Sequence, residues 1–201
     1  HKKGYDILLI GHNNHPEVIG TMGQLPKGSI KLIETVNDAN SINSKEFSKP
    51  VAYITQTTLS VDDTAEIIET LKEKFPGIKQ PVKEDICYAT TNRKAAVKAI
   101  AARCDMMVVI GAPNSSNSKR LVEVAQKTGW EAATLVQRAN EIPWGDLAAN
   151  ETLGITAGAS APEVLVEEAI AAARTHFDVT VEEIKVADEN VVFSLPRALS
   201  A

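Results

Sequence analysis

Short apolar runs alternate along this chain with longer stretches whose apolar residues recur every three or four positions. Six short runs predict strands, at residues 6–10, 29–33, 51–55, 106–110, 132–136 and 152–156. Four longer stretches predict amphipathic helices, at residues 62–75, 95–103, 119–128 and 162–175. Strands that alternate with helices are typical of α/β proteins with mainly parallel sheets.

A segment with Pro76, Gly77 and Pro81 separates two stretches of similar size. These residues interrupt regular structure, so the segment predicts a boundary between two α/β units. We expect one unit at residues 1–82 and a second at 83–176. Strand-like runs at 179–186 and 191–193 are expected in a carboxyl-terminal segment, 177–201. No repeat of roughly 20–50 residues is evident.

Charge and composition narrow the class of protein. The 201 residues carry 21 basic and 26 acidic side chains with no Lys/Arg-rich block, which argues against a nucleic-acid groove as the main function. No apolar run approaches the ~20 residues that cross a bilayer, and no apolar signal segment follows the first residues, so a cytoplasmic location is expected. Only Cys87 and Cys104 are present, too few for a disulfide framework.

Four predicted loops carry small, hydroxyl and amide residues where a strand ends and a helix begins, at residues 11–17, 55–60, 111–118 and 156–160. In an open parallel sheet such loops lie at the carboxyl ends of the strands, where ligands bind. Free N–H groups at helix starts favour anions, so we expect a phosphate, diphosphate or carboxylate ligand. Helix capping by Ser, Thr and Asn is the alternative explanation for any single loop.

Two serines support the capping alternative. Ser60 has Asp63 three residues later, and Ser160 has Glu163 at the same spacing. This spacing is typical of a capping box, in which the two side chains bind backbone N–H groups of the first turn. We therefore expect both serines to begin helices.

An acid–base pair is predicted in the first loop. His15 and Glu17 flank Pro16, and a turn there lets both side chains project into one cleft. A histidine at a strand end can instead bind a neighbouring loop, and this alternative stays open for His15. His12 is the weaker candidate for such chemistry.

The two cysteines have different surroundings. Cys87 precedes a predicted helix that Thr90 or Thr91 is expected to cap. A thiol just before a helix start has its thiolate favoured, as a nucleophile or metal ligand requires, whereas a small buried hydrophobe is the alternative. Cys104 precedes the strand at 106–110, so we expect it at the opposite end of the sheet, in a structural role.

Five segments spread over the whole chain carry a family resemblance: 11–24 (GHNNHPEVIGTMGQ), 55–63 (TQTTLSVDD), 86–93 (ICYATTNR), 114–118 (NSSNS) and 156–162 (TAGASAP). The chain resembles the 4-hydroxy-3-methylbut-2-enyl diphosphate reductase family, also called IspH or LytB. The resemblance implies two Rossmann-like α/β/α units, the remainder of a three-unit pseudo-symmetric fold. Residues 1–82 would be the second unit, incomplete at its start, and 83–176 the third. The amino-terminal part is expected to be missing.

The resemblance implies an iron–sulfur oxidoreductase. Family members reductively remove the allylic hydroxyl of 4-hydroxy-3-methylbut-2-enyl diphosphate, giving isopentenyl and dimethylallyl diphosphate in non-mevalonate isoprenoid biosynthesis. They use a 4Fe–4S cluster held by three cysteines and a donor such as ferredoxin or flavodoxin. By motif, Cys87 is implied as one cluster ligand. Two further ligands are expected to be absent from this chain, which we therefore expect to be inactive alone.

The same matching implies roles for the loop residues. Glu17 is implied as the acid that delivers protons, and Thr57 as its partner near the substrate hydroxyl. The diphosphate is implied to be held by residues with neutral donors: His15, Ser115, Ser116, Asn117 and Ser160.

Two alternatives stay open from the residues alone. A non-catalytic phosphate or sugar-phosphate-binding module could use the same serine-rich loops without iron. A sugar-phosphate isomerase would need a base and no thiolate. The iron content of protein purified without oxygen separates these hypotheses from the reductase.

Overall fold

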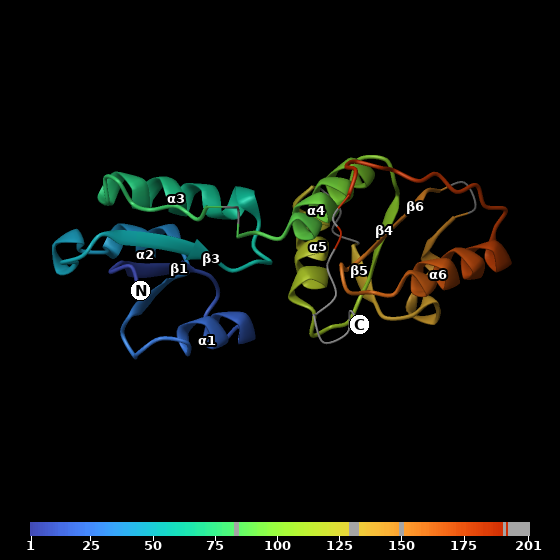
Figure 1. Cartoon of the computed structure of the whole chain (residues 1–201). Coiled ribbons are helices and arrows are strands. Elements are labelled where there is room, and N and C mark those ends of the chain that lie inside the picture. The colour runs from blue at the N-terminus through green and yellow to red at the C-terminus, as the bar shows by residue number, and fades with distance from the viewer. Residues whose placement is uncertain (83–84, 129–132, 149–150, 191, 193–201) are drawn as a thin grey trace.

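The computed structural model describes residues 1–82, 85–128, 133–148, 151–190 and 192. Its strands form two parallel sheets (Figure 1). In the first, β1 (Asp6–Ile10) lies between β2 (Ile30–Ile33) and β3 (Val51–Thr55). In the second, β4 (Met106–Ile110) lies between β5 (Thr134–Val136) and β6 (Leu153–Ala157). The predicted α/β class is confirmed, with strand bounds within two residues of expectation.

The helices flank the two sheets. The first unit contains α1 (Pro16–Met22), α2 (Val36–Ser41) and α3 (Val61–Lys74), with a 3-10 turn at Ser44–Glu46. The second contains α4 (Tyr88–Ala101), α5 (Ser116–Lys127) and α6 (Glu163–His176), with 3-10 turns at Ala139–Glu141 and Trp144–Asp146. Among the described residues, no helix has the length and apolar character that crossing a membrane requires. The sheets lie on either side of the proposed 82/83 boundary, which stays a prediction.

Several predicted helix starts were wrong. Helix α4 begins at Tyr88 rather than at residue 95, and its N-cap is Cys87 rather than Thr90 or Thr91. Thr90 lies inside the first turn and is buried by tertiary packing, which overrides its preference for a cap.

Neither predicted serine capping box forms. Ser60 is the N-cap of α3, but its side chain makes no capping hydrogen bond within the described structure. Ser160 lies in a turn closed by the Ala161 N–H on the Gly158 carbonyl, and Pro162 is the N-cap of α6. The Ser160 side chain is therefore left exposed instead of bound to its helix.

The two units repeat one topology, at a spacing longer than the roughly 20–50 residues of common repeat proteins. Strands β1 and β4 begin at residues 6 and 106, and each is the central strand of a sheet of the same order. Each is followed by a glycine, Gly11 or Gly111, and then by a loop that enters a helix. The two units, about 100 residues apart, thus share a strand order and a loop position, whereas the side chains of the corresponding loops differ.

The core of the second unit surrounds β4, all five residues of which are buried. Met107 and Val109 pack with Val97 of α4 and Leu121 of α5, on one face of the sheet. The other face packs against α6. Helices α4 and α5 thus lie between the two sheets (Figure 1), where Lys94 of α4 and Ser116 of α5 meet the loops of the first unit.

The predicted strand at 179–186 was wrong. Residues 178–190 are extended without pairing into a sheet, and they run along α4 (Figure 1). Glu182 pairs with Arg103 at 2.9 Å, and Asn92 donates to Glu189 at 2.9 Å. The backbone N–H and C=O groups of a helix are already bonded to each other, so α4 gives this segment no partner for strand pairing. The alternating sequence pattern therefore does not produce a strand here. The expected strand at 191–193 lies outside the described residues, apart from Val192.

Candidate functional site

The loops after β1 and β4 meet across the two units. His15 Nε2 lies 2.5 Å from the Ser116 hydroxyl, although the residues are 101 positions apart. The His15 Nδ1 atom accepts a hydrogen bond from the Glu17 N–H at 3.2 Å, so Nδ1 carries no proton. The neutral ring therefore holds its proton on Nε2 and donates it to Ser116. His15 also serves as the N-cap of α1.

Glu17 binds the loop after β3 through both carboxylate oxygens. Its Oε1 accepts the Thr57 N–H at 2.8 Å, and its Oε2 accepts the Thr57 hydroxyl at 3.0 Å. The two bonds fix the orientation of a half-buried carboxylate from the first turn of α1. The structure thus brings together the two residues that the family resemblance implies for proton delivery.

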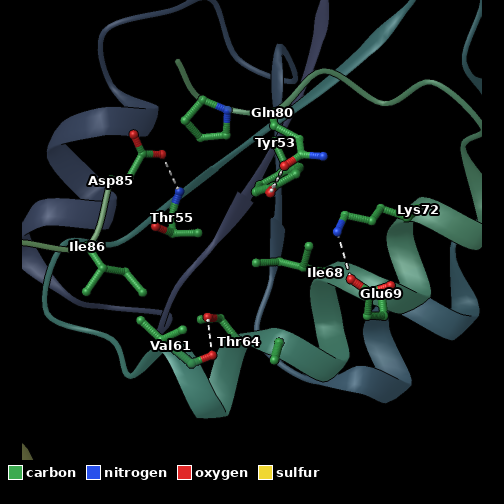
Figure 2. A pocket seen from close by; sticks show the side chains of 12 residues that line it. Tyr53, Thr55, Val61, Thr64, Ile68, Glu69, Lys72, Gln80, Asp85 and Ile86 are labelled. Atoms are coloured by element: carbon green, nitrogen blue, oxygen red, sulfur yellow. Dashed lines mark hydrogen bonds and ion pairs between the residues drawn. The ribbon is translucent and has the colours of Figure 1, made fainter. Parts of the chain in front are cut away.

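Thr57 also contacts the start of α4. The Cys87 N–H donates to the Thr57 carbonyl at 3.0 Å, and the Cys87 side chain is exposed. A second link lies two residues earlier in each segment, where the Thr55 N–H donates to the Asp85 carboxylate at 3.0 Å (Figure 2). Thr57 is therefore bonded both to the carboxylate of Glu17 and to the backbone of Cys87.

The Ser-rich loop after β4 contains a buried amide without partners. Asn117 is 8% exposed, and neither atom of its side-chain amide has a hydrogen-bond partner among the described residues. Such groups are rare because each unmade bond of a buried polar atom costs about 1–3 kcal/mol. Among the described residues, only Asn117 has two buried side-chain polar atoms without a partner, which makes it a candidate ligand-binding residue.

Ser115 and Ser118 shape this loop. Ser115 caps α5, and its hydroxyl accepts from the Ser118 N–H at 3.2 Å and from the Ser118 hydroxyl at 3.0 Å. A Cβ atom on either Gly111 or Gly158 would lie 2.2 Å from the Ser118 hydroxyl. Only glycine therefore lets the strand ends of β4 and β6 close around Ser118. This packing brings the loop that carries the exposed Ser160 beside Asn117.

His12 has a structural contact that no sequence pattern indicated. Its Nε2 lies 2.5 Å from Nη2 of Arg120 on α5, and its N–H donates to Gln56 at 3.0 Å. Burial, and then the Arg120 guanidinium, lower the pKa of His12, so the ring accepts from Arg120 as a neutral base. Arg120, 108 positions away, also pairs with Glu123.

The cysteines differ as expected. Cys104 is 4% exposed in the core beside Val97 and Met107, and burial raises the pKa of its thiol. Its structural role is confirmed. Cys87 instead lines a hollow of about 390 Å³ with Asp85, Ile86, Tyr88, Thr91 and Asn92. Within the described ranges, no group of three or more His, Cys, Asp or Glu side chains could hold a metal ion.

A second hollow, of about 290 Å³, lies between β3 and α3 and is also lined by Asp85 and Ile86 from beyond the proposed 82/83 boundary (Figure 2). Tyr53, Thr55, Ile68 and Asp85 are among its lining residues, and it includes none of the predicted diphosphate-binding residues. Burial raises the pKa of Tyr53 there. The candidate site is therefore the convergence of loops around Thr57 and Asn117, and not this hollow.

Comparisons with known proteins identify the family of this chain. The LytB protein family model matches residues 1–174. Proteins named 4-hydroxy-3-methylbut-2-enyl diphosphate reductase from Paracoccus denitrificans and Cereibacter sphaeroides are 56% and 57% identical over 199 residues. The alignments cover 99% of this chain and 63% and 62% of those relatives.

A solved structure gives the same result. The E-1-hydroxy-2-methyl-but-2-enyl-4-diphosphate reductase from Plasmodium falciparum is 37% identical, with a TM-score of 0.83. The match covers 98% of this chain and 62% of that one. This chain thus spans less than two thirds of its relatives' length, and the position of the uncovered part stays a prediction. The family match over residues 1–174 nevertheless shows that the chain belongs to the LytB family.

Proposed function

We propose that this chain carries the proton-delivery and diphosphate-binding parts of a 4-hydroxy-3-methylbut-2-enyl diphosphate reductase. The observation that carries the proposal is that Thr57 bonds the Glu17 carboxylate, at 2.8 and 3.0 Å, and also the Cys87 backbone N–H, at 3.0 Å. An acid and a residue with an exposed thiol that bond the same threonine suit a reaction that needs both protons and electrons. The family membership of the relatives supports the same chemistry.

The proposed reaction replaces a carbon–oxygen bond by a carbon–hydrogen bond. It consumes two electrons and two protons, because the hydroxyl leaves as water and a hydrogen is added to the allyl group. We assign the delivery of a proton to Glu17. The Thr57 hydroxyl, already bonded to this carboxylate, would orient the acid toward the substrate oxygen.

The diphosphate is assigned to the loops at the starts of α1 and α5 and after β6. Ser115, Ser116, Asn117 and Ser160 offer neutral donors, and His15 offers its Nε2–H. Helix α5 has 12 residues, so its first turn adds N–H groups and the positive end of a helix dipole. Neutral donors suit a chain whose net charge is −5.

The donor set fits one corner of a 4Fe–4S cluster. Cys87 supplies an exposed thiol at a helix start, whereas Cys104 is buried in the core. When bound, the cluster would supply electrons and an open iron position for the substrate oxygen. Its other two cysteine ligands are assigned to the part of the relatives that this chain does not span. A ferredoxin or flavodoxin donor, implied by the resemblance, and the cytoplasmic location expected from the sequence complete the proposal.

The test uses a chimera that joins this chain to the remaining part of the Paracoccus relative. Cys87→Ser in the chimera should abolish turnover and lower iron content after anaerobic reconstitution. Cys104→Ala is the matched control and should retain both. A Cys87→Ser chimera with unchanged iron and turnover would refute the assignment of Cys87.

Anion binding without redox chemistry is a second candidate function. The buried, unpartnered amide of Asn117 favours it, since this feature requires no thiol. It predicts that pyrophosphate binds the chain alone, that Cys87→Ser leaves the affinity unchanged, and that anaerobically purified chimera contains no iron. Iron in the chimera would exclude it.

A further inference from the structure

Lys94 is a buried cation that joins the two units. It belongs to α4 of the second unit and is 5% exposed. Its ammonium donates to the Leu59 carbonyl at 2.7 Å and to the Thr58 carbonyl at 3.2 Å, both in the loop after β3. Lysine is rarely buried, because the charge loses its hydration. Burial, and then the Arg120 charge, lower the pKa of Lys94 to about 8.

Lys94 and Cys87 contact the same loop. Cys87 is the N-cap of α4, and Lys94 lies in the second turn of the same helix. The Cys87 N–H binds the Thr57 carbonyl, and Lys94 binds the next two carbonyls along the chain. The loop that presents Thr57 to Glu17 is thus attached to α4 at consecutive residues.

The neighbour of Lys94 makes the corresponding contact within the second unit. Arg93 Nη1 donates to the carbonyl of Ala157, the last residue of β6, at 3.1 Å. Two adjacent cations of α4 therefore hold the loop that contains Thr57 and the strand end that leads to Ser160. Carbonyl oxygens, rather than carboxylates, are the bonded partners of both.

We propose that Lys94 is a positioning residue that holds the Thr57 loop against the start of α4. It thereby fixes the Cys87 thiol relative to the Glu17–Thr57 pair. The importance of this spacing rests on the proposed function, whereas the contact itself does not. Lys98, one turn further along α4, also crosses to the first unit, where it pairs with Asp62 at 2.5 Å. That pair is exposed, and exposed ion pairs contribute little.

The charges around Lys94 determine its response to pH. Arg120 on α5 disfavours the ammonium, while Asp62 and Asp63 on α3 and Glu123 on α5 favour it. Below pH about 8 the ammonium makes charge-assisted bonds to both carbonyls. Because an exposed lysine holds its proton up to a pH near 10.5, the buried site disfavours the charged form, and this cost of burial falls as the pH rises above about 8.

The test measures the proximity of the loop to the helix in the 201-residue chain. Thr57→Cys places a second thiol beside Cys87, and a short bifunctional thiol reagent cross-links the two. The cross-linking rate, relative to single alkylation, should fall at least about tenfold when Lys94→Met is added, because hydrogen bonds to a charged group are lost. Lys94→Arg should restore most of it, and the control Lys98→Met should change it less than about twofold.

A Lys94→Met chain that cross-links as fast as the Lys98→Met chain would overturn the proposal. If Lys94→Met does not fold, the unsubstituted chain provides the test by NMR. The carbonyl carbons of Thr58 and Leu59 should shift together with a midpoint near pH 8. Resonances that do not titrate between pH about 7 and 9 would also overturn it. Neither measurement uses the cluster or the substrate, so failure here leaves the proposed function standing.

Discussion

The two units share one backbone topology but carry different side chains at equivalent loop positions. Glu17 and Asn117 occupy the same position after the glycine that ends the central strand, in helices capped by His15 and Ser115. The Glu17 carboxylate is fully engaged by Thr57, whereas the Asn117 amide has no partner within the described chain. Under the proposed function, proton delivery belongs to the first unit, and the second unit supplies every proposed diphosphate-binding residue except His15.

The largest expected stability effect tests whether both loops need their glycine. Gly111→Ala should lower the free energy of unfolding by about 3 kcal/mol, because its Cβ would overlap Ser118. Gly11→Ala should cost less, since its Cβ would meet the Val18 side chain at 2.7 Å. Gly20→Ala, where nothing lies within 4 Å, should stabilise helix α1. Urea unfolding measures all three, and an unaffected Gly111→Ala chain would show that the loop has another packing.

The next prediction contrasts the equivalent positions directly. Asn117→Leu should raise the free energy of unfolding of the unliganded chain by about 1 kcal/mol, because it removes unpaired buried atoms. Glu17→Leu should lower it by about 1 kcal/mol, because Thr57 loses two acceptors. Thermal unfolding without ligand measures both. If both variants changed the free energy of unfolding in the same direction, Glu17 and Asn117 would not differ in the way proposed here.

The two N-caps should be similar in strength. Ser115→Ala and His15→Ala should each cost about 1 kcal/mol, since each leaves an N–H of the first helical turn without its acceptor. His15→Asn should restore most of the loss, because asparagine is a good N-cap. A His15→Asn chain as unstable as His15→Ala would show that the contact with Ser116 matters more than the cap.

The smallest effect concerns pH and the loop that precedes His15. The pKa of His12 is lowered in the folded chain, mainly by burial and then by Arg120, so the unfolded chain binds its proton more readily. This contribution to stability is present above pH about 6.5 and is lost as the pH falls toward the lower folded value. Unfolding measured at several pH values should show a small loss of stability in this range. His12→Asn should remove that slope, and an unchanged slope in His12→Asn would contradict the contact with Arg120.

Local patterns in the sequence predicted the strands and the positions of the loops. Apolar runs such as the one at β4 are buried on both faces, and the loop residues follow them directly. The motifs also identified Glu17 and Thr57, which the structure joins. These features depend on short-range periodicity and on family-specific residues.

Contacts between the units were not predictable in this way. Nothing in the local sequence distinguishes Lys94 from an exposed helical lysine. Its carbonyl partners lie 35 and 36 positions away. Arg120 reaches His12 over 108 positions. The start of α4 and the path of residues 178–190 also depend on tertiary packing, which local propensity does not encode.

The division of roles is tested most directly by Glu17→Gln in the chimera, with turnover and pyrophosphate affinity measured on the same preparation. Glu66→Gln, an exposed change on α3, is the control. The account predicts that Glu17→Gln lowers turnover at least about a hundredfold, the range expected for loss of a general acid, while pyrophosphate affinity changes less than about threefold. Pyrophosphate affinity that falls as far as turnover, or turnover that is retained, would contradict it.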